Sequence, residues 1–149
     1  MKARLHTDGG ARGNPGPAGI GVVLADDVGK VIADIAKGIG RATNNTAEYE
    51  ALIAGLELAL DHGVSEIEVF VDSELVARQV RGEWKIKKEH LRGPAVKARG
   101  LMDRFRSASI SEVRRERNAD ADKLANQGMD QAELDLELDR ERDTPSLFD

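Results

Sequence analysis

The first forty residues alternate between apolar and polar side chains, which is the period of β-strands. Alternation over residues 2–8 predicts a first strand, and Ile20, Val22 and Leu24 predict a second. A run rich in glycine and proline, residues 9–17, separates the two. Residues 26–29 predict a reverse turn, and residues 30–37 alternate again as a returning strand. Because short links join these strands, we expect an antiparallel meander.

From Thr46 onwards the apolar positions follow the period of a helix. They recur at spacings of three and four residues, at Tyr49, Leu52, Ile53, Leu56 and Leu60. Asn45 or Thr46 is a suitable N-cap, and Gly63 stands where such a helix would end. The pattern predicts one long helix whose single apolar face packs against a sheet.

The second half of the chain alternates between helices and strands. Residues 67–71 predict a short buried strand, and Ser73 can cap a helix that continues to about Arg81. A basic helix over residues 89–106, a strand over 109–114 and a last helix over 119–129 follow. The order βββαβααβα predicts an α/β fold. Its five-stranded mixed sheet would have three antiparallel strands, then parallel crossovers, with helices on both faces.

Composition narrows the class of protein. The chain has 149 residues, which suits one compact domain, and it has no cysteine for a disulfide or a thiolate metal site. It has neither an apolar run of about 18 residues nor the apolar start of a signal peptide. We therefore expect a cytoplasmic monomer with no membrane partner.

The net charge of −5 argues against a nucleic-acid partner until it is divided along the chain. Residues 130–149 carry eight acids and two bases, whereas residues 78–106 carry ten bases and three acids. Leu134, Leu136 and Leu138 alternate with charges, a spacing that suits neither a long helix nor a core. We therefore predict a catalytic domain over residues 1–129 and an acidic, flexible tail over residues 130–149.

Four acids stand at the ends of predicted elements. Asp8 ends the first strand, Asp72 follows the strand at 67–71, and Glu48 and Asp122 lie in the first turns of two helices. If these two strands are parallel, Asp8 and Asp72 meet at one edge of the sheet, where α/β proteins build their sites. Converging carboxylates repel one another, and Mg²⁺, which prefers oxygen ligands, relieves the repulsion. The alternative is that these acids only cap helices or favour helix dipoles.

Four blocks of sequence resemble type 1 ribonuclease H, in that family's order and across about residues 2–129. They are Thr7-Asp8-Gly9-Gly10 with Gly13-Asn14-Pro15-Gly16-Pro17-Ala18-Gly19, then Thr43-Asn44-Asn45-Thr46-Ala47-Glu48, then Val71-Asp72-Ser73, then Arg117-Asn118 with Ala121-Asp122 and Leu124-Ala125. The resemblance implies a ribonuclease H-like fold and a catalytic, metal-binding set of Asp8, Glu48, Asp72 and Asp122. It also implies two Mg²⁺ ions per site, with Mn²⁺ able to substitute.

The activity that the resemblance implies is hydrolysis of the RNA strand of RNA–DNA hybrids, with little sequence preference. The products would carry 5′-phosphate and 3′-hydroxyl ends. The residues that the resemblance assigns to substrate binding are Gly10, Asn14, Arg41, Thr43, Asn44 and Asn45. The abbreviated basic segment at 82–88 adds Trp84, Lys85 and Lys87 as candidates, although Trp84 suits a core position equally well.

The chain departs from many members of the family in the loop before Asp122. That loop carries no histidine, so the chain resembles the short-loop subtype of archaea and some bacteria, and Glu116 or Arg115 is a weak candidate substitute. Some members of this subtype also cut double-stranded RNA, which makes such RNA a further candidate substrate.

Two rival functions stay open. One is a hybrid-binding module without catalysis, and the other is a nuclease for double-stranded RNA or DNA junctions. At the C-terminus, Leu147-Phe148 suggests weak docking to another protein, although an unimportant terminus is the simpler interpretation.

Overall fold

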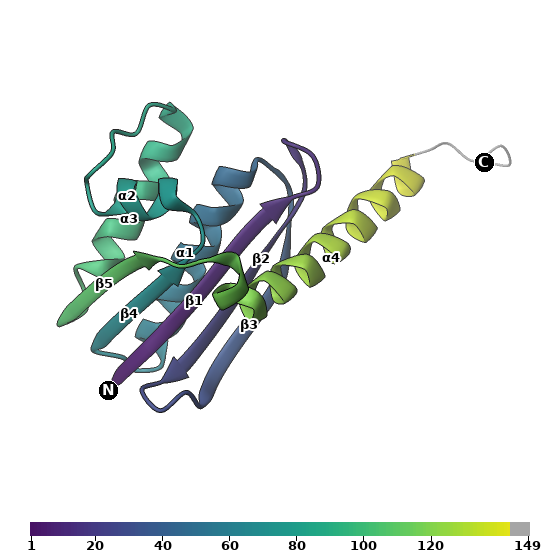
Figure 1. The fold of residues 1–149 in the computed structure, drawn as a ribbon. Helices are drawn as coiled ribbons and strands as arrows, with labels where there is room; N and C mark the ends of the chain where they lie inside the picture. The colour runs from purple at the N-terminus through teal and green to yellow at the C-terminus, as the bar shows by residue number, and fades with distance from the viewer. Residues whose placement is uncertain (144–149) are drawn as a thin grey trace, which may run out of the picture.

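A computed structural model describes residues 1–143 of the protein. Its centre is one five-stranded sheet with the order β3-β2-β1-β4-β5 (Figure 1). The strands are listed here in chain order: β1 Lys2–Ala11, β2 Gly16–Asp26, β3 Val31–Ala42, β4 Glu66–Val71 and β5 Ser107–Glu112. β1, β2 and β3 pair antiparallel, whereas β4 pairs parallel with both β1 and β5. The predicted mixed sheet is therefore confirmed.

The meander is longer than the hydrophobic alternation indicated. β1 continues past Asp8 because Gly9, Gly10 and Ala11 keep their partners on β2. β3 extends to Ala42, and β5 begins two residues before the predicted strand and ends at Glu112. The turn at residues 26–29 is present, and Gly29 has a φ of 89°, which glycine adopts readily.

One face of the sheet is covered by α1 (Asn44–Asp61), α2 (Glu74–Val80) and α3 (Arg92–Met102), with a short 3₁₀ turn, η1 (Glu89–Leu91), before α3 (Figure 1). The predicted basic helix thus begins as η1 and ends at Met102. The main core lies between α1 and the sheet, where Leu5, Leu52, Leu56 and Val69 are essentially inaccessible to solvent. Gly63 has a φ of 75° just after α1, and Ser73 caps α2 by accepting a bond from the Val76 N–H.

The other face is covered by α4 (Ala119–Asp143), which follows a 3₁₀ turn, η2 (Arg115–Asn118), and crosses β1, β2 and β3 (Figure 1). Glycines allow this helix to approach the sheet closely. A Cβ on Gly21 would lie 2.0 Å from the Ala121 carbonyl oxygen, and a Cβ on Gly128 would lie 2.3 Å from that of Lys37. The packing holds α4, and with it Asp122, in one position over the sheet.

The expectation that regular structure ends at Met129 is wrong, because α4 continues to Asp143. Met129 and Ala132 are buried, and Leu136 lies one turn further along the same face. This helical spacing was hidden by the alternation of leucine with charged residues. The proposed docking residues Leu147-Phe148 lie outside the described residues.

No helix within residues 1–143 is both long enough and apolar enough to span a membrane.

Candidate active site

Asp8 and Asp72 lie at the same level of two neighbouring strands. The last parallel pair between β1 and β4 is His6 with Phe70. Asp8 lies two residues after His6 on β1, and Asp72 lies two residues after Phe70, just after the end of β4. Asp8 therefore lies inside β1 rather than at its end, but at the point where β4 leaves its side. Asp8 is buried, with 5% of its surface exposed. Asp8 and Asp72 thus lie side by side at one edge of the parallel pair, as the sequence predicts.

Glu48 reaches this point from α1. Thr43, in extended backbone conformation, caps α1 through a bond of 3.2 Å from the Thr46 N–H to its side-chain oxygen. The helix therefore begins at Asn44, before the predicted cap at Asn45 or Thr46, and Glu48 lies in its second turn rather than its first. The Gly9 N–H donates to Glu48 Oε1 at 3.0 Å. A Cβ on Gly9 would lie 2.1 Å from the Ala47 carbonyl oxygen, so glycine at this position lets α1 lie against β1.

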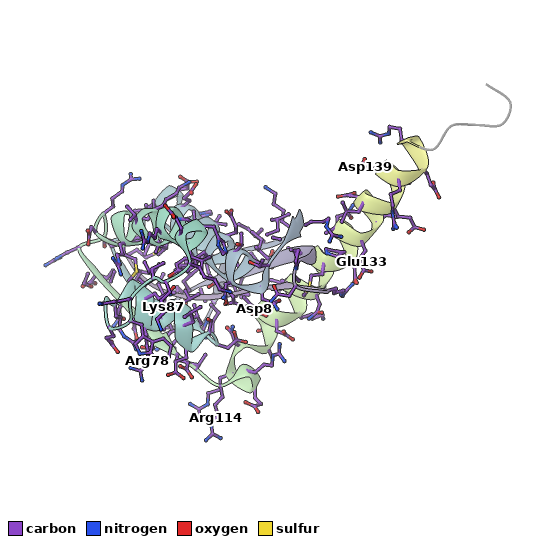
Figure 2. The ribbon with its side chains drawn as sticks, turned by 90° about the horizontal axis from the view of Figure 1, so that it is seen from above. Asp8, Arg78, Lys87, Arg114, Glu133 and Asp139 are labelled. Atoms are coloured by element: carbon purple, nitrogen blue, oxygen red, sulfur yellow. The ribbon has the colours of Figure 1, made fainter. Side chains whose placement is uncertain are left out.

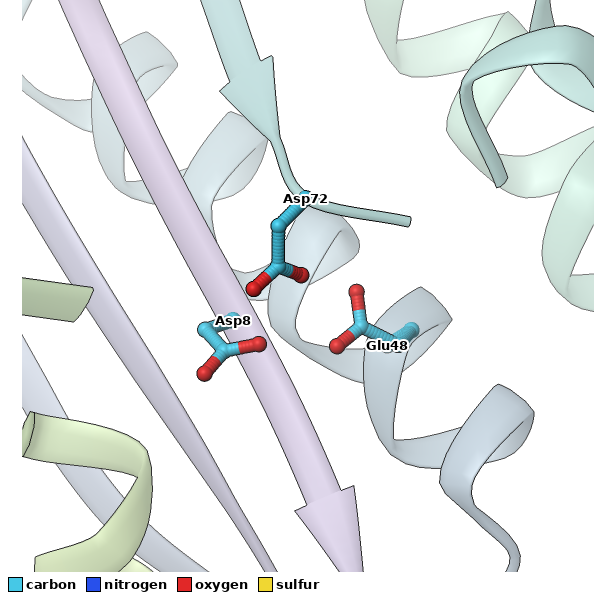
Figure 3. Close-up of side chains that lie close together, drawn as sticks. All are labelled: Asp8, Glu48 and Asp72. Atoms are coloured by element: carbon cyan, nitrogen blue, oxygen red, sulfur yellow. The ribbon is translucent and has the colours of Figure 1, made fainter. Parts of the chain in front are cut away.

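Three carboxylates consequently face one another across a small space (Figure 3). One oxygen from each of Asp8, Glu48 and Asp72 lies within 4.8 Å of the others. Asp122, in the first turn of α4, lines the same hollow from the opposite face of the sheet. Four elements that are distant in the sequence thus bring all four predicted acids together.

Arg115 is the cation beside these acids. Its Nε lies 4.0 Å from Asp72 Oδ2 and 3.9 Å from Asp122 Oδ1. The side chain is mostly exposed, at 78%, so it lies over the mouth of the hollow rather than inside it. A single exposed guanidinium offsets only a small part of the charge of four carboxylates.

The surroundings of the three inner acids disfavour their charged forms. Burial, and then the charge of Asp72 and the contact with Asp122, raise the pKa of Asp8 to about 7. Burial, and then Asp8, raise the pKa of Glu48 well above its usual value, and burial raises that of Asp72 although Arg115 opposes the shift. A cluster of this kind suits a bound cation, because the cation neutralises the carboxylates that the neighbouring side chains leave uncompensated. Clustered carboxylate oxygens are the donors that Mg²⁺ and Mn²⁺ prefer.

We expect the stability of the metal-free protein to fall as pH rises. Between pH 4 and 7 unfolded Asp8, with its ordinary pKa near 3.8, loses its proton, whereas folded Asp8 keeps it. The folded state then binds more protons, so Asp8 lowers the free energy of unfolding by about 1 kcal/mol per pH unit up to about pH 7, and the raised pKa of Glu48 acts in the same direction. Urea unfolding in chelator at pH 5, 6 and 7 measures this slope.

The Asp8→Asn variant is the control for that slope. It lacks the Asp8 carboxyl group and also relieves Glu48, whose pKa Asp8 helps to raise, so the wild-type slope minus the variant slope measures this pair of acids apart from His6. Mg²⁺ is expected to stabilise the wild type more at pH 8 than at pH 6. Parallel slopes for the two proteins would contradict the raised pKa.

Several predicted substrate residues lie beside the carboxylates. Gly10 and Asn44 line the hollow, and Asn44 Oδ1 accepts a bond of 2.8 Å from the Ala11 N–H. Asn14 Oδ1 in turn accepts from the Asn44 N–H at 3.1 Å. Thr43 precedes Asn44 as the helix cap, Asn45 follows it in α1, and Arg41 lies near the end of β3. We call these residues the margin of the carboxylate hollow. Gly10 and Asn44 line the hollow itself, whereas Arg41 lines a neighbouring hollow together with Pro17 and Glu133.

The second group of predicted substrate residues lies elsewhere. Trp84, Lys85 and Lys87 belong to the loop between α2 and η1, and none of them lines the carboxylate hollow (Figure 2 labels Lys87 and Asp8). Trp84 is 42% exposed, which excludes the core position, and the Arg78 guanidinium lies 5.2 Å from its ring centroid. The loop is a separate basic surface.

Sequence reasoning missed four residues of the hollow, namely Gly9, Ser73, Asn126 and Met129. Ser73 was interpreted only as a helix cap, a role that it does have. Asn126 stands one turn after Asp122 on α4, and that helical spacing was the available signal.

Comparisons with known proteins agree with this geometry. Residues 6–128 match the model of the reverse transcriptase-like family. Ribonuclease HI of Halobacterium salinarum is 48% identical over 131 residues, which are 87% of this chain and 66% of that protein. The crystal structure of a ribonuclease H1 from this archaeon superposes with a TM-score of 0.86 at 46% identity, covering 89% of this chain and all of that one. The chain belongs to the type 1 ribonuclease H family.

Two other relatives add context for this member of the family. A bifunctional protein of Mycobacterium tuberculosis is 49% identical over 133 residues, which are 89% of this chain but only 36% of that protein. The chain thus spans about a third of the length of its mycobacterial relatives. A ribonuclease H1 solved in complex with an RNA/DNA hybrid superposes with a TM-score of 0.82 at 42% identity, covering 87% of this chain and 98% of that one.

The loop before Asp122 is short in the structure. Only Val113 and Arg114 separate β5 from the turn η2, and α4 begins at Ala119. No histidine lies in this stretch, and one of the relatives is archaeal; the short-loop subtype stays a prediction.

Proposed function

We propose that the protein is a metal-dependent endoribonuclease that hydrolyses the RNA strand of RNA–DNA hybrids. The observation that carries the proposal is the convergence of Asp8, Glu48 and Asp72 within 4.8 Å in a member of the ribonuclease H family. The complex of the related ribonuclease H1 with an RNA/DNA hybrid supports the choice of substrate. The proposed products carry 5′-phosphate and 3′-hydroxyl ends.

The four acids have two tasks in this proposal. Asp8, Glu48, Asp72 and Asp122 would hold two Mg²⁺ ions, or Mn²⁺ in their place. When bound, such ions activate a water and stabilise the leaving oxygen of a phosphoryl transfer. The protein itself fixes the acids: Asp8 by strand pairing, and Glu48 by the Gly9 N–H. Preset oxygens of this kind spare the protein any rearrangement during the reaction.

The margin beside the acids would hold the duplex. Asn44 and Asn45 are suited to the minor groove, while Thr43, Asn14 and Arg41 are suited to backbone phosphates, and Gly10 permits a ribose to approach. A wide minor groove with 2′-hydroxyl groups distinguishes RNA-containing duplexes from DNA. Contacts to backbone and 2′-hydroxyl groups carry little sequence information, so we expect little sequence preference. Trp84, Lys85 and Lys87 would add charge and a stacking surface for the DNA strand.

Double-stranded RNA is the second candidate substrate. Arg115, which lies beside Asp72 and Asp122, would supply a cation in place of the absent loop histidine for this substrate. We expect such RNA to be cut more slowly than hybrid.

One cleavage experiment separates these functions. Labelled RNA–DNA hybrid, duplex RNA and duplex DNA are incubated with Mg²⁺, with Mn²⁺ and with chelator. We expect cleavage of the hybrid's RNA strand with either metal and none with chelator, with 3′-hydroxyl ends that a polymerase extends. Binding of hybrid without cleavage in either metal would contradict the proposal and favour a binding module. Faster cleavage of duplex RNA than of hybrid would assign the second substrate instead.

A further inference from the structure

The turn between β1 and β2, residues 11–16, is held to α1 on one side. The Ala11 N–H donates to Asn44 Oδ1 at 2.8 Å, and Asn14 Oδ1 accepts from the Asn44 N–H at 3.1 Å. These bonds connect the turn to the first residue of α1. They constrain the side of the turn that lies next to the proposed substrate residues.

On its other side the turn is held to α4 by Arg12. Its Nη1 lies 2.6 Å from Asp130 Oδ1 and 3.2 Å from Glu133 Oε1. Its Nη2 donates to the Asn126 carbonyl oxygen at 3.3 Å. We call Arg12, Asn126, Asp130 and Glu133 the Arg12 clamp. Figure 2 shows Glu133 on α4, between Asp8 and the far end of that helix.

The clamp lies between two parts of the site. Asn126 lines the carboxylate hollow together with Asp122. Arg12 lies between Gly10 and Asn14 in the sequence, both of which we assign to substrate binding. One guanidinium thus connects the helix that carries Asp122 to the turn that would contact the duplex.

We propose that Arg12 is a positioning residue, and that the part of α4 beyond Met129 belongs to the substrate-binding framework. This inference rests on the proposed function, because it gives the clamp the task of holding the turn where a hybrid binds. The close glycine contacts fix α4 on the sheet, so loss of the clamp frees the turn rather than the helix. Substrate affinity is therefore expected to change, and the rate of the chemical step is not.

For one double variant, electrostatic repulsion alone predicts tighter binding of the hybrid, whereas the Arg12 clamp predicts weaker binding. Asp130→Asn with Glu133→Gln removes two negative charges near a nucleic-acid site, which by electrostatics strengthens binding. The same change replaces the two charged acceptors of Arg12 by neutral amides and leaves Asn126 as its other partner, which loosens the turn and weakens binding. Weaker binding by the variant therefore indicates that the clamp positions the turn. Tighter binding would indicate that the two acids only repel the substrate, or that α4 competes with it.

The experiment measures binding of a fluorescent RNA–DNA hybrid in chelator, and kcat and KM in Mg²⁺. For the double variant we expect about fivefold weaker binding and a similar rise in KM, with kcat within about twofold. Arg12→Ala is expected to weaken binding of the hybrid at least as much as the double variant does. Arg12→Lys is expected to weaken it less, because lysine keeps the charge but not the fork of donors. Unchanged or tighter binding by the double variant overturns the proposal.

A matched control changes the same charge at a distance. Asp139→Asn with Glu141→Gln lies on the same helix, away from Arg12, and is expected to bind hybrid as tightly as the wild type or more so. Thermal unfolding of each variant shows whether it is folded at the assay temperature. If the wild type binds hybrid but does not cut it, the proposed activity fails, while the binding data still decide the role of the clamp.

Discussion

Asp72→Asn is expected to reduce cleavage of the RNA strand of a hybrid by at least about 10³-fold in saturating Mg²⁺. The substitution keeps the shape of the side chain but replaces one anionic oxygen of the carboxylate cluster by an amide nitrogen. Asp72 is one of the three acids whose oxygens lie within 4.8 Å of one another, so the substitution removes one of the proposed metal ligands. Single-turnover cleavage of labelled hybrid measures the chemical step without product release.

Binding of hybrid by the Asp72→Asn variant is expected to be at least as tight as that of the wild type in chelator. The variant has one negative charge fewer beside the nucleic acid, and the margin formed by Asn14, Thr43 and Asn44 is unaltered. Asp135→Asn, on the exposed part of α4, is the control for removal of an acid and is expected to cut at the wild-type rate. Cleavage by Asp72→Asn at the wild-type rate would contradict the assignment of this acid to a metal.

Gly21→Ala is expected to destabilise the protein by about 3 kcal/mol or more. The added methyl group would lie 2.0 Å from the Ala121 carbonyl oxygen and 2.5 Å from the Ala125 backbone nitrogen. Because both neighbours are backbone, no side-chain rotation relieves the clash, and α4 has to move away from β2. A fall of roughly 10 °C in Tm follows for a domain of this size.

Gly100→Ala is the matched control. Gly100 lies in α3, and no heavy atom lies within 4 Å of the position that its Cβ would occupy. Alanine favours the helix by about 1 kcal/mol over glycine, so this variant is expected to be slightly more stable than the wild type. Both variants are compared by thermal unfolding in the same buffer. A Tm for Gly21→Ala within 2 °C of the wild type would contradict the close packing of α4 on the sheet.

The sequence pattern sufficed for most of the fold because the periods of strand and helix are local. Alternation identified the strands of the meander, and the spacing of three and four identified α1. Gly63 and Ser73 marked helix ends through their own backbone and side-chain chemistry. The pattern was insufficient where a partner, rather than periodicity, extends an element, as in the pairing of Gly9 to Ala11 with β2.

The candidate site was predictable to the level of which acids meet. Parallel pairing of β1 and β4 brings Asp8 beside Asp72 whatever the details of the loops. The turn of α1 that carries Glu48 was misplaced because Thr43, not Asn45 or Thr46, caps the helix. The roles of these acids and of the substrate residues stay predictions for the experiments above.

The sequence by itself determined the order of elements, the mixed sheet and the four acids, since these depend on local periodicity and on short motifs. Only the tertiary structure decided the fate of residues 130–143. Their charges and alternating leucines indicate a solvated tail when they are considered alone. In the structure these residues instead continue α4. Ala132 is buried against the sheet, and Asp130 and Glu133 form ion pairs with Arg12, more than a hundred residues away. Contacts at that separation leave no periodic signal in the sequence, so only the folded chain reveals them.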